Sequence, residues 1–212
     1  MSITGILEEG RKDQSKIYGV VVGIVTNNKD DDGLGRVKVK IPRISGEDES
    51  HWARVTAFMA GKERGAFFLP EVDDEVLVVF EHGDINMPYV IGSLWNGVDT
   101  PPGTNSDGEN NIRVIKSRSG HIIRLDDKDG EEKIEIIDKS EKNFISIDTK
   151  DNKITISSDK DIELSARNGK VIIDAKDIEI KSSASTKVEA SADMDLKASG
   201  NNNIKGATVN IN

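Results

Sequence analysis

The chain has 212 residues, a hydrophobic fraction of 35%, an aromatic fraction of only 4% and a net charge of -9. This acidic balance argues against the basic surface of a nucleic-acid binder and against a polybasic membrane anchor. The absence of cysteine excludes disulfides and thiolate metal sites, and no stretch approaches the roughly 20 apolar residues of a membrane-spanning helix.

Residues 1–16 precede the first stretch with strand character. They lack a basic region followed by an apolar run, which is the pattern of a secretory signal. We therefore expect the chain to be made and folded in the cytoplasm.

Short stretches rich in β-branched and aromatic residues, separated by turn residues, follow at 17–28, 35–42, 51–60, 74–83 and 87–95. Such stretches are typical of strands. The segment RVKVKI alternates cleanly, which places Val37, Val39 and Ile41 on one face and three basic residues on the other. Five or six strands without helical periodicity predict a small barrel such as an OB-fold over residues 17–97.

Two loops of this half were considered as sites. The stretch KDDDGLG (29–35) resembles a calcium loop only loosely, since the later ligands of an EF-hand are missing, and a solvated hairpin turn is the better interpretation. The stretch GKERG (61–65) is interpreted as a barrel loop. The three histidines, His51, His82 and His121, are too far apart in sequence for a metal-ligand motif, and we expect no cofactor, metal or catalytic residue.

The composition changes near residue 100. Eight of the nine aromatic residues lie before it, and all five prolines lie at or before Pro102. The intervening stretch is dense in turn residues, so we expect a linker over residues 98–111.

The second half repeats pairs of apolar residues at i and i+2, which point to one side of a strand. Ile180, Val188, Leu196 and Ile204 then follow at a strict spacing of eight residues, and a small residue comes two places after each of the last three. A short fixed period indicates stacked equivalent elements. A disordered tail has a similar composition, but it has no reason to keep apolar pairs in register.

An octad supplies only one wall of a solenoid, so three identical chains around a common axis are the natural solution. The sequence thus predicts an all-β protein, in which an N-terminal OB-fold barrel is followed by a trimeric triple-stranded β-helix, a β-prism needle, over residues 112–212. The predicted trimer core consists of Ile134, Ile136, Ile145, Ile147, Ile154, Ile156, Ile162, Leu164, Val171, Ile173, Ile178, Ile180, Val188, Leu196 and Ile204.

Several motifs resemble a known family as an ordered set: GRVKV, WARV, AG, RG, FLPEV, DEVLV, HGD, VIGS and SGH. They resemble the central spike proteins of contractile injection systems, namely the phage baseplate assembly protein V family, the VgrG spikes of type VI secretion, and the spikes of phage-tail-like particles. Asp73 departs from the pattern, because such proteins often have glycine there. This departure puts only the local turn in doubt. The resemblance runs from about Tyr18 to the C-terminus.

The resemblance implies a homotrimeric structural spike that sits beneath a tail tube and leads it through the target membrane when the sheath contracts. We therefore expect a membrane-puncturing role in which the spike joins the hub and tube to a tip protein. Because only about 16 residues precede the barrel, it implies the short type, which needs a separate trimeric hub protein, and we expect Ile3, Ile6 and Leu7 to contact that hub. A PAAR-like tip protein is expected on a platform formed by Thr208, Val209, Asn210, Ile211 and Asn212. The assembled spike would act outside the cell or across the target envelope.

Two other classes of function were weighed. An OB module for single-stranded nucleic acid needs a basic groove with stacking aromatics, and the first hundred residues carry 11 Lys and Arg against 17 Asp and Glu. A β-helical enzyme that cleaves surface glycans needs paired carboxylates in a cleft, and a thin needle offers acids without a cleft. Both were ranked below a structural spike.

Overall fold

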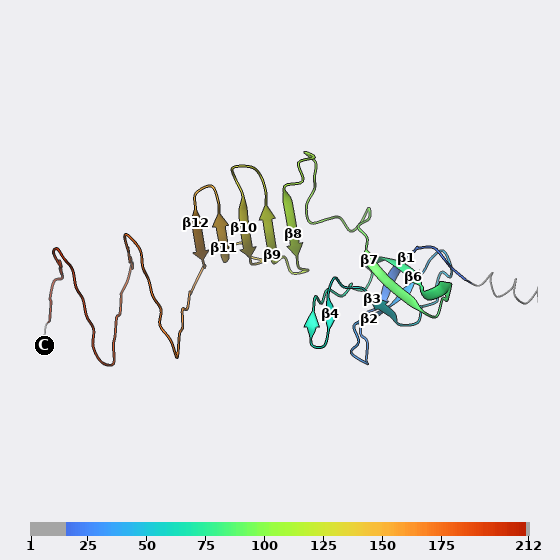
Figure 1. Ribbon diagram of the computed structural model, residues 1–212, viewed down its shortest axis with the longest axis horizontal. Helices are drawn as coiled ribbons and strands as arrows, with labels where there is room; N and C mark the ends of the chain where they lie inside the picture. The colour runs from blue at the N-terminus through green and yellow to red at the C-terminus, as the bar shows by residue number, and fades with distance from the viewer. Residues whose placement is uncertain (1–15, 211–212) are drawn as a thin grey trace, which may run out of the picture. The chain divides into compact units, whose positions relative to one another are not determined.

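The computed structural model describes residues 16–210, and all regular structure in this range is β-strand apart from one 3-10 turn (Figure 1). Three regions follow one another along the chain: a closed barrel with a small hairpin, a five-stranded sheet, and an extended segment without assigned strands.

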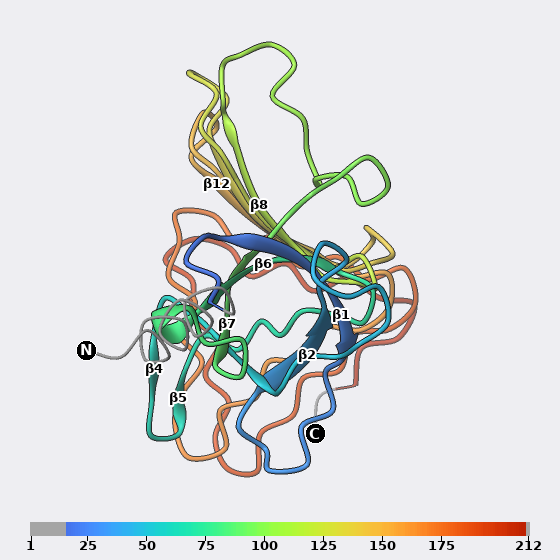
Figure 2. The same cartoon turned by 90° about the vertical axis from the view of Figure 1, so that its right-hand side faces the viewer.

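The barrel is closed by five strands in the order β1-β2-β3-β7-β6, which encircle the domain in Figure 2. Its antiparallel pairs are completed by one parallel pair between β3 and β7. The strands are β1 (Val21–Asn27), β2 (Arg36–Lys40), β3 (Ala53–Val55), β6 (Glu75–Phe80) and β7 (Pro88–Ser93). Closure leaves the sheet with no open edge. The expected small barrel is therefore confirmed.

The barrel core is built from small branched side chains. The alternation predicted for β2 is observed, since Val37 and Val39 are fully buried and the basic residues between them are only partly buried. Val76 and Val78 on β6 alternate in the same way. One face of each strand thus fills the interior, as the pleat of a half-buried strand requires.

The turn before β6 contains the residue that departs from the family pattern. Asp73 has a φ of 76°, in the left-handed region that favours glycine. Its amide donates a hydrogen bond of 2.9 Å to the Val25 carbonyl, so the turn is anchored to the end of the neighbouring strand. Aspartate tolerates this conformation better than most residues, and the turn keeps its geometry without glycine.

A two-stranded hairpin projects from the barrel sequence between β3 and β6. It pairs β4 (Ala60–Gly61) with β5 (Arg64–Gly65), so the expected loop at 61–65 is a tight hairpin. Gly65 has a φ of 143°, and a Cβ there would lie 2.4 Å from the Met59 carbonyl oxygen. Only glycine fits this position.

The second region is an antiparallel five-stranded sheet in the order β12-β11-β10-β9-β8 (Figure 1). Its strands are β8 (Ile112–Lys116), β9 (Ile122–Asp126), β10 (Lys133–Ile137), β11 (Phe144–Asp148) and β12 (Lys153–Ser157). Each strand pairs with its sequence neighbour in an unbroken register of five residue pairs. The sheet is therefore a meander made by one chain.

Within one chain, β8 to β12 thus form a meander, and the intertwined trimeric helix expected over residues 112–212 stays a prediction. In an intertwined helix the strands of different chains would pair, whereas β8 to β12 pair within the chain. Turn residues in the left-handed region, Gly120, Gly130, Glu141 and Asn152, recur about every eleven residues and reverse the chain each time. A five-residue strand and a hairpin turn fit into that spacing, but the later octad leaves only three residues for a turn.

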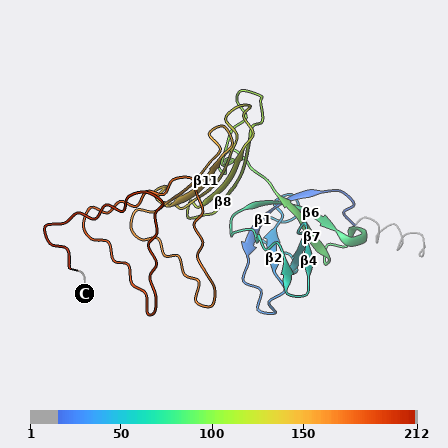
Figure 3. The same ribbon diagram turned by 60° about the vertical axis from the view of Figure 1, so that its left-hand side comes forward.

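Residues 162–210 form a compact unit of their own in which no strand is assigned, and the chain runs back and forth in extended stretches (Figure 3). In this stretch the only backbone–backbone hydrogen bond joins Gly169 to Ala166. Backbone N–H and C=O groups normally find hydrogen-bond partners in folded proteins. These extended stretches have the composition of strands, but within the described residues no neighbouring strand supplies such partners. A triple-stranded helix is consistent with this state and stays a prediction for this segment.

Candidate functional site, the uncovered isoleucine face

One face of the five-stranded sheet is almost entirely apolar. The register places Ile134 opposite Ile147, Ile136 opposite Ile145, and Ile145 and Ile147 opposite Ile156 and Ile154. Directly opposite residues lie on the same face of a sheet. We call this surface the isoleucine face; it consists of Ile115, Ile123, Leu125, Ile134, Ile136, Ile145, Ile147, Ile154 and Ile156.

On the opposite face of the sheet, ion pairs and one row of apolar side chains join neighbouring strands. Arg124 on β9 forms an ion pair with Glu135 directly across on β10, with hydrogen bonds of 2.8 and 2.5 Å. Lys133 lies 3.3 Å from Asp148 on β11. Ile122, Ile137 and Phe144 form a cross-strand row near the turns. These side chains cover one another and are half-buried in the single chain.

The isoleucine face has no such cover. Ile136 is 51% exposed and Ile145 41% exposed, whereas the valines of the barrel core are fully buried. Since buried apolar area stabilises folded proteins by about 25 cal/mol per Å², this surface is a strong candidate for an interface.

The predicted trimer-core residues beyond residue 161 are exposed to a similar or larger extent. They form a distal stripe that consists of Ile162, Leu164, Val171, Ile173, Ile178, Ile180, Val188, Leu196 and Ile204. Val209 of the predicted tip platform is also exposed. Ile211 and Asn212, and the predicted hub contacts Ile3, Ile6 and Leu7, lie outside the described residues.

The sequence analysis missed the first part of this face. Ile115, Ile123 and Leu125 lie in register with the predicted core residues, but the predicted list begins at Ile134. The signal was present in the alternation of HIIRLD, where Ile123 and Leu125 are two residues apart. The apolar neighbour Ile122 obscured it, because it breaks the simple apolar–polar pattern.

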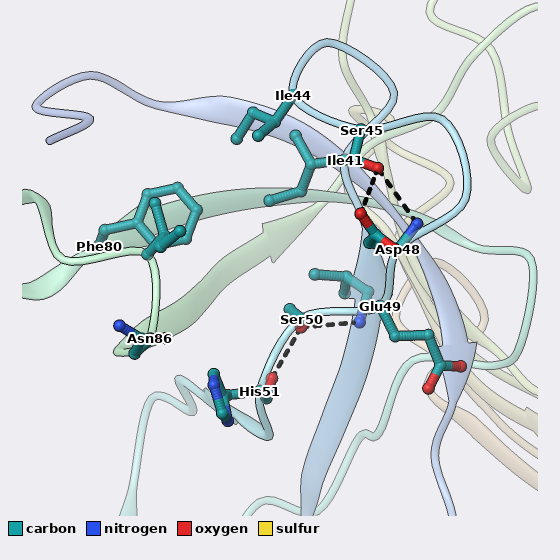
Figure 4. A pocket seen from close by; sticks show the side chains of 11 residues that line it. Ile41, Ile44, Ser45, Asp48, Glu49, Ser50, His51, Phe80 and Asn86 are labelled. Carbon is teal, nitrogen blue, oxygen red and sulfur yellow. Dashed lines mark hydrogen bonds between the residues drawn. The ribbon is translucent and has the colours of Figure 1, made fainter. Parts of the chain in front are cut away.

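An open apolar hollow of the barrel has Asp48 and Glu49 among its lining residues and is the candidate for a catalytic site (Figure 4). Asp48 accepts a hydrogen bond of 2.7 Å from the Ser45 hydroxyl, and the Thr26 hydroxyl and the Lys38 ammonium group lower the pKa of Glu49. A carboxyl group that serves as general acid in glycan cleavage needs a raised pKa. The hollow is thus a poor fit to that chemistry.

The histidines have structural positions. His51 lies at the rim of the hollow, and His82 occupies the 3-10 turn Glu81–Gly83 with a φ of 48°. The His121 Nδ1 atom accepts a hydrogen bond of 3.2 Å from the Lys139 amide, which joins the β8–β9 turn to the β10–β11 turn. Across residues 16–210, no group of three or more metal-ligating side chains gathers, and no helix is long and apolar enough to cross a membrane.

The turn KDDDGLG is organised by an arginine. The guanidinium of Arg36 donates hydrogen bonds of 2.8 and 2.7 Å to the two oxygens of Asp30, whose side chain is only 3% exposed, and it also contacts Asp32. These bonds hold the pKa of Asp30 well below its usual range. The carboxylate also accepts backbone hydrogen bonds from Asp32 and Leu34. Its oxygens are therefore already used within the turn.

The strand face that OB-folds use for nucleic acid carries few available cations. Trp52 lies between Arg36 and Lys38, at 5.7 and 5.4 Å from the ring centre. Arg36 is paired with two aspartates and Lys38 with Glu49 at 3.2 Å. Binding to phosphates relies on cations that can replace condensed counterions. The pairing therefore weakens the alternative of a nucleic-acid module.

Comparison with known proteins relates the barrel to one family. Residues 21–95 match the family model of the type VI secretion system/phage-baseplate injector OB domain. The type VI secretion system spike protein VgrG3 of Vibrio cholerae is 37% identical over 75 residues, which are 34% of this chain and 7% of that protein. The barrel is thus similar to the injector OB domains of VgrG-like spike proteins.

Two further relatives cover a similar part of the chain. The spike protein VgrG1a of Pseudomonas aeruginosa is 37% identical over 87 residues, or 39% of this chain and 14% of its own length. The actin cross-linking toxin VgrG1 of Vibrio cholerae is 38% identical over 77 residues, or 34% and 7%. The chain thus matches only a small fraction of these relatives, and the match centres on the barrel.

Proposed function

We propose that this chain forms the central spike of a contractile injection system. The observation that carries the proposal is the combination of an injector OB barrel with about 100 following residues whose apolar side chains have no cover within the chain. A spike built from several copies accounts for both features.

Three copies of the chain are proposed to cover the isoleucine face. Three meander sheets, each with its apolar face inward, form a prism whose outer surface carries the ion pairs of the opposite face, such as Arg124–Glu135. Beyond residue 161, where no strand is assigned within the described residues, the three chains are proposed to wind around each other and to pair between copies. Closed cyclic symmetry of this kind is common among homo-oligomers.

The proposed action is mechanical. A narrow prism in which strands are paired and apolar side chains are enclosed concentrates force from a contracting sheath on a small tip. The barrel end, with Ile3, Ile6 and Leu7, is proposed to face a separate trimeric hub, and the C-terminal end, with Val209 and Ile211, to seat a PAAR-like tip protein. Contact with the target membrane is transient in this account, and no residue acts as a catalyst.

The role can be tested in the cell that encodes the protein. A chain with a tag inserted in the linker 98–111 should sediment with contractile particles, and antibody-coupled gold should label one end of each particle in electron micrographs. The same tag on a chain with Ile145→Asp, which places a charge on the isoleucine face, should be absent from particles. Recovery of the unmodified chain only outside such particles would contradict the proposal.

A further inference from the structure

Exposed apolar side chains gather around the β4–β5 hairpin of the barrel. Leu34, Met59, Phe67 and Phe68 line one shallow hollow beside it, and each of them is more than half exposed. Phe58, immediately before Met59, is 90% exposed, more than any other aromatic side chain among the described residues. Exposed apolar clusters of this kind mark interaction surfaces. We call these five exposed side chains around the hairpin the aromatic knob.

A second apolar surface lies at the other end of strand β2. It is the hollow drawn in Figure 4, a cavity of about 240 Å³ whose apolar lining includes Ile41, Ile44, Phe80 and Ile85. Ile44 and Ile85 are each nearly half exposed at its mouth. The cavity is lined mostly by carbon, and its rim carries polar groups, an arrangement typical of pockets that accept an apolar side chain.

The knob and the hollow of one barrel do not reach each other. Leu34 precedes strand β2 and Ile41 follows it, and the five residues of the strand alone span about 16 Å. The β4–β5 hairpin itself is too short to cross this distance. Any contact between knob and hollow therefore joins two molecules.

We propose that Phe58 of one protomer seats in the Ile44–Ile85 hollow of the next, so that three barrels close a head-to-tail ring. The inference rests on the proposed trimer, because the common needle brings the barrels together. A head-to-tail contact closes into a ring when the rotation that relates neighbouring copies returns to the first copy. The proposed needle of three chains relates its copies by such a rotation.

Charge and tethering both favour a second copy as the occupant. The hairpin carries Lys62 and Arg64, and the rim of the hollow carries Asp48. The short linker that joins each barrel to its sheet raises the effective concentration of one barrel near another to about millimolar. A modest apolar contact is occupied under those conditions.

The test uses the absence of native cysteine. The double variant Ala57→Cys/Asn86→Cys places one thiol beside Phe58 and one at the rim of the hollow, while both apolar surfaces are kept. Treated with a short bis-maleimide, the full-length protein should give a covalent product of three chains on a denaturing gel. Each single variant should give no such product, because a head-to-tail contact brings different positions together.

Two further variants make the result specific. Adding Phe58→Ala should lower the cross-linked fraction about tenfold, since burial of this side chain stabilises the contact. The pair Ala57→Cys/Val22→Cys places the second thiol on the outer surface of β1 and should react only at background level. A cross-linked fraction that is equal in all these variants would overturn the proposal.

Light scattering separates this proposal from the one on which it rests. A protein of three chains by light scattering that yields no cross-linked product above the Val22→Cys control would overturn the knob-and-hollow contact and leave the spike in place. A protein of one chain would overturn both.

Discussion

The barrel and the five-stranded sheet use the same kind of side chain in opposite ways. In the barrel, Val39 and Val78 point inward and are fully buried, whereas on the sheet Ile136 and Ile154 are 51% and 68% exposed. Both regions alternate their side chains with a period of two. The difference arises because five barrel strands close on themselves, while the meander remains an open sheet.

This contrast shows where the stability of each region comes from. A closed sheet covers its own apolar face and satisfies its own edges. An open sheet with one apolar face needs a second layer, which domains normally supply from another element. Within the described residues no such layer covers the isoleucine face, and in the proposed spike other copies of the chain supply it. The barrel should therefore be stable alone, and the needle only as an assembly.

The largest expected effect is the loss of assembly on charging the isoleucine face. Ile145→Asp would bury a carboxylate from each chain at the centre of the prism, and an unpaired buried charge costs several kcal/mol. We expect light scattering to report single chains at micromolar concentration.

The matched control for this variant is Thr155→Asp, on the opposite face of the neighbouring strand. It should keep the mass of three chains. A trimer that survives Ile145→Asp would show that this face is not the interface.

A smaller effect is expected in the barrel core. Val78→Ala removes two buried methyl groups and should lower the free energy of unfolding of the barrel by about 2 kcal/mol. Both tryptophans, Trp52 and Trp95, lie in the barrel half, so their fluorescence during denaturant unfolding reports on the barrel alone. The partly exposed Val22→Ala serves as control with a smaller loss. Dissociation of the trimer by Val78→Ala would contradict the independence of the two regions.

The smallest effect concerns pH and a turn of the needle. Hydrogen bonds from the Ser140 hydroxyl and the Asn143 amide lower the pKa of Asp138 from 3.8 to about 2. Because the folded state favours the ionised carboxylate, its contribution is complete above about pH 4 and is lost as the pH falls toward 2.

The measurement for Asp138 is thermal unfolding followed by far-ultraviolet circular dichroism. Asp138→Asn should lower the unfolding temperature of the needle at pH 7, and its difference from the unmodified protein should vanish near pH 2. Asp129→Asn, at an exposed position in the β9–β10 turn, is the control. A difference that stays constant with pH would exclude the carboxylate as its source.

The sequence predicted the barrel well because each strand is short, alternating and bounded by turn residues. The alternation of RVKVKI predicts that Val37, Val39 and Ile41 share one face of a strand, and all three are buried. The pairing of the second half was harder to predict, because apolar pairs at i and i+2 fit both a meander and an intertwined helix. Left-handed residues at Glu141 and Asn152 turn the chain into the meander. Asparagine is common in that conformation, whereas glutamate is not, so the turn at Glu141 carries no clear signal in the sequence.

The interface surfaces were predicted only in part. A repeating pattern identified Ile134 to Ile156 as a group, because regular spacing is visible in a sequence. The aromatic knob at Phe58 and the hollow at Ile44 depend on loops that bring distant residues together. No periodicity marks such surfaces, and only the fold reveals them.

The central claim is that copies of this chain cover the isoleucine face. The most direct test is the mass of the purified full-length protein, measured by light scattering coupled to gel filtration, before and after mild SDS without heating. The account predicts a species of three chains, about three times the chain mass of 23.2 kDa, that persists in SDS. A single chain of 23.2 kDa in the absence of SDS would contradict it.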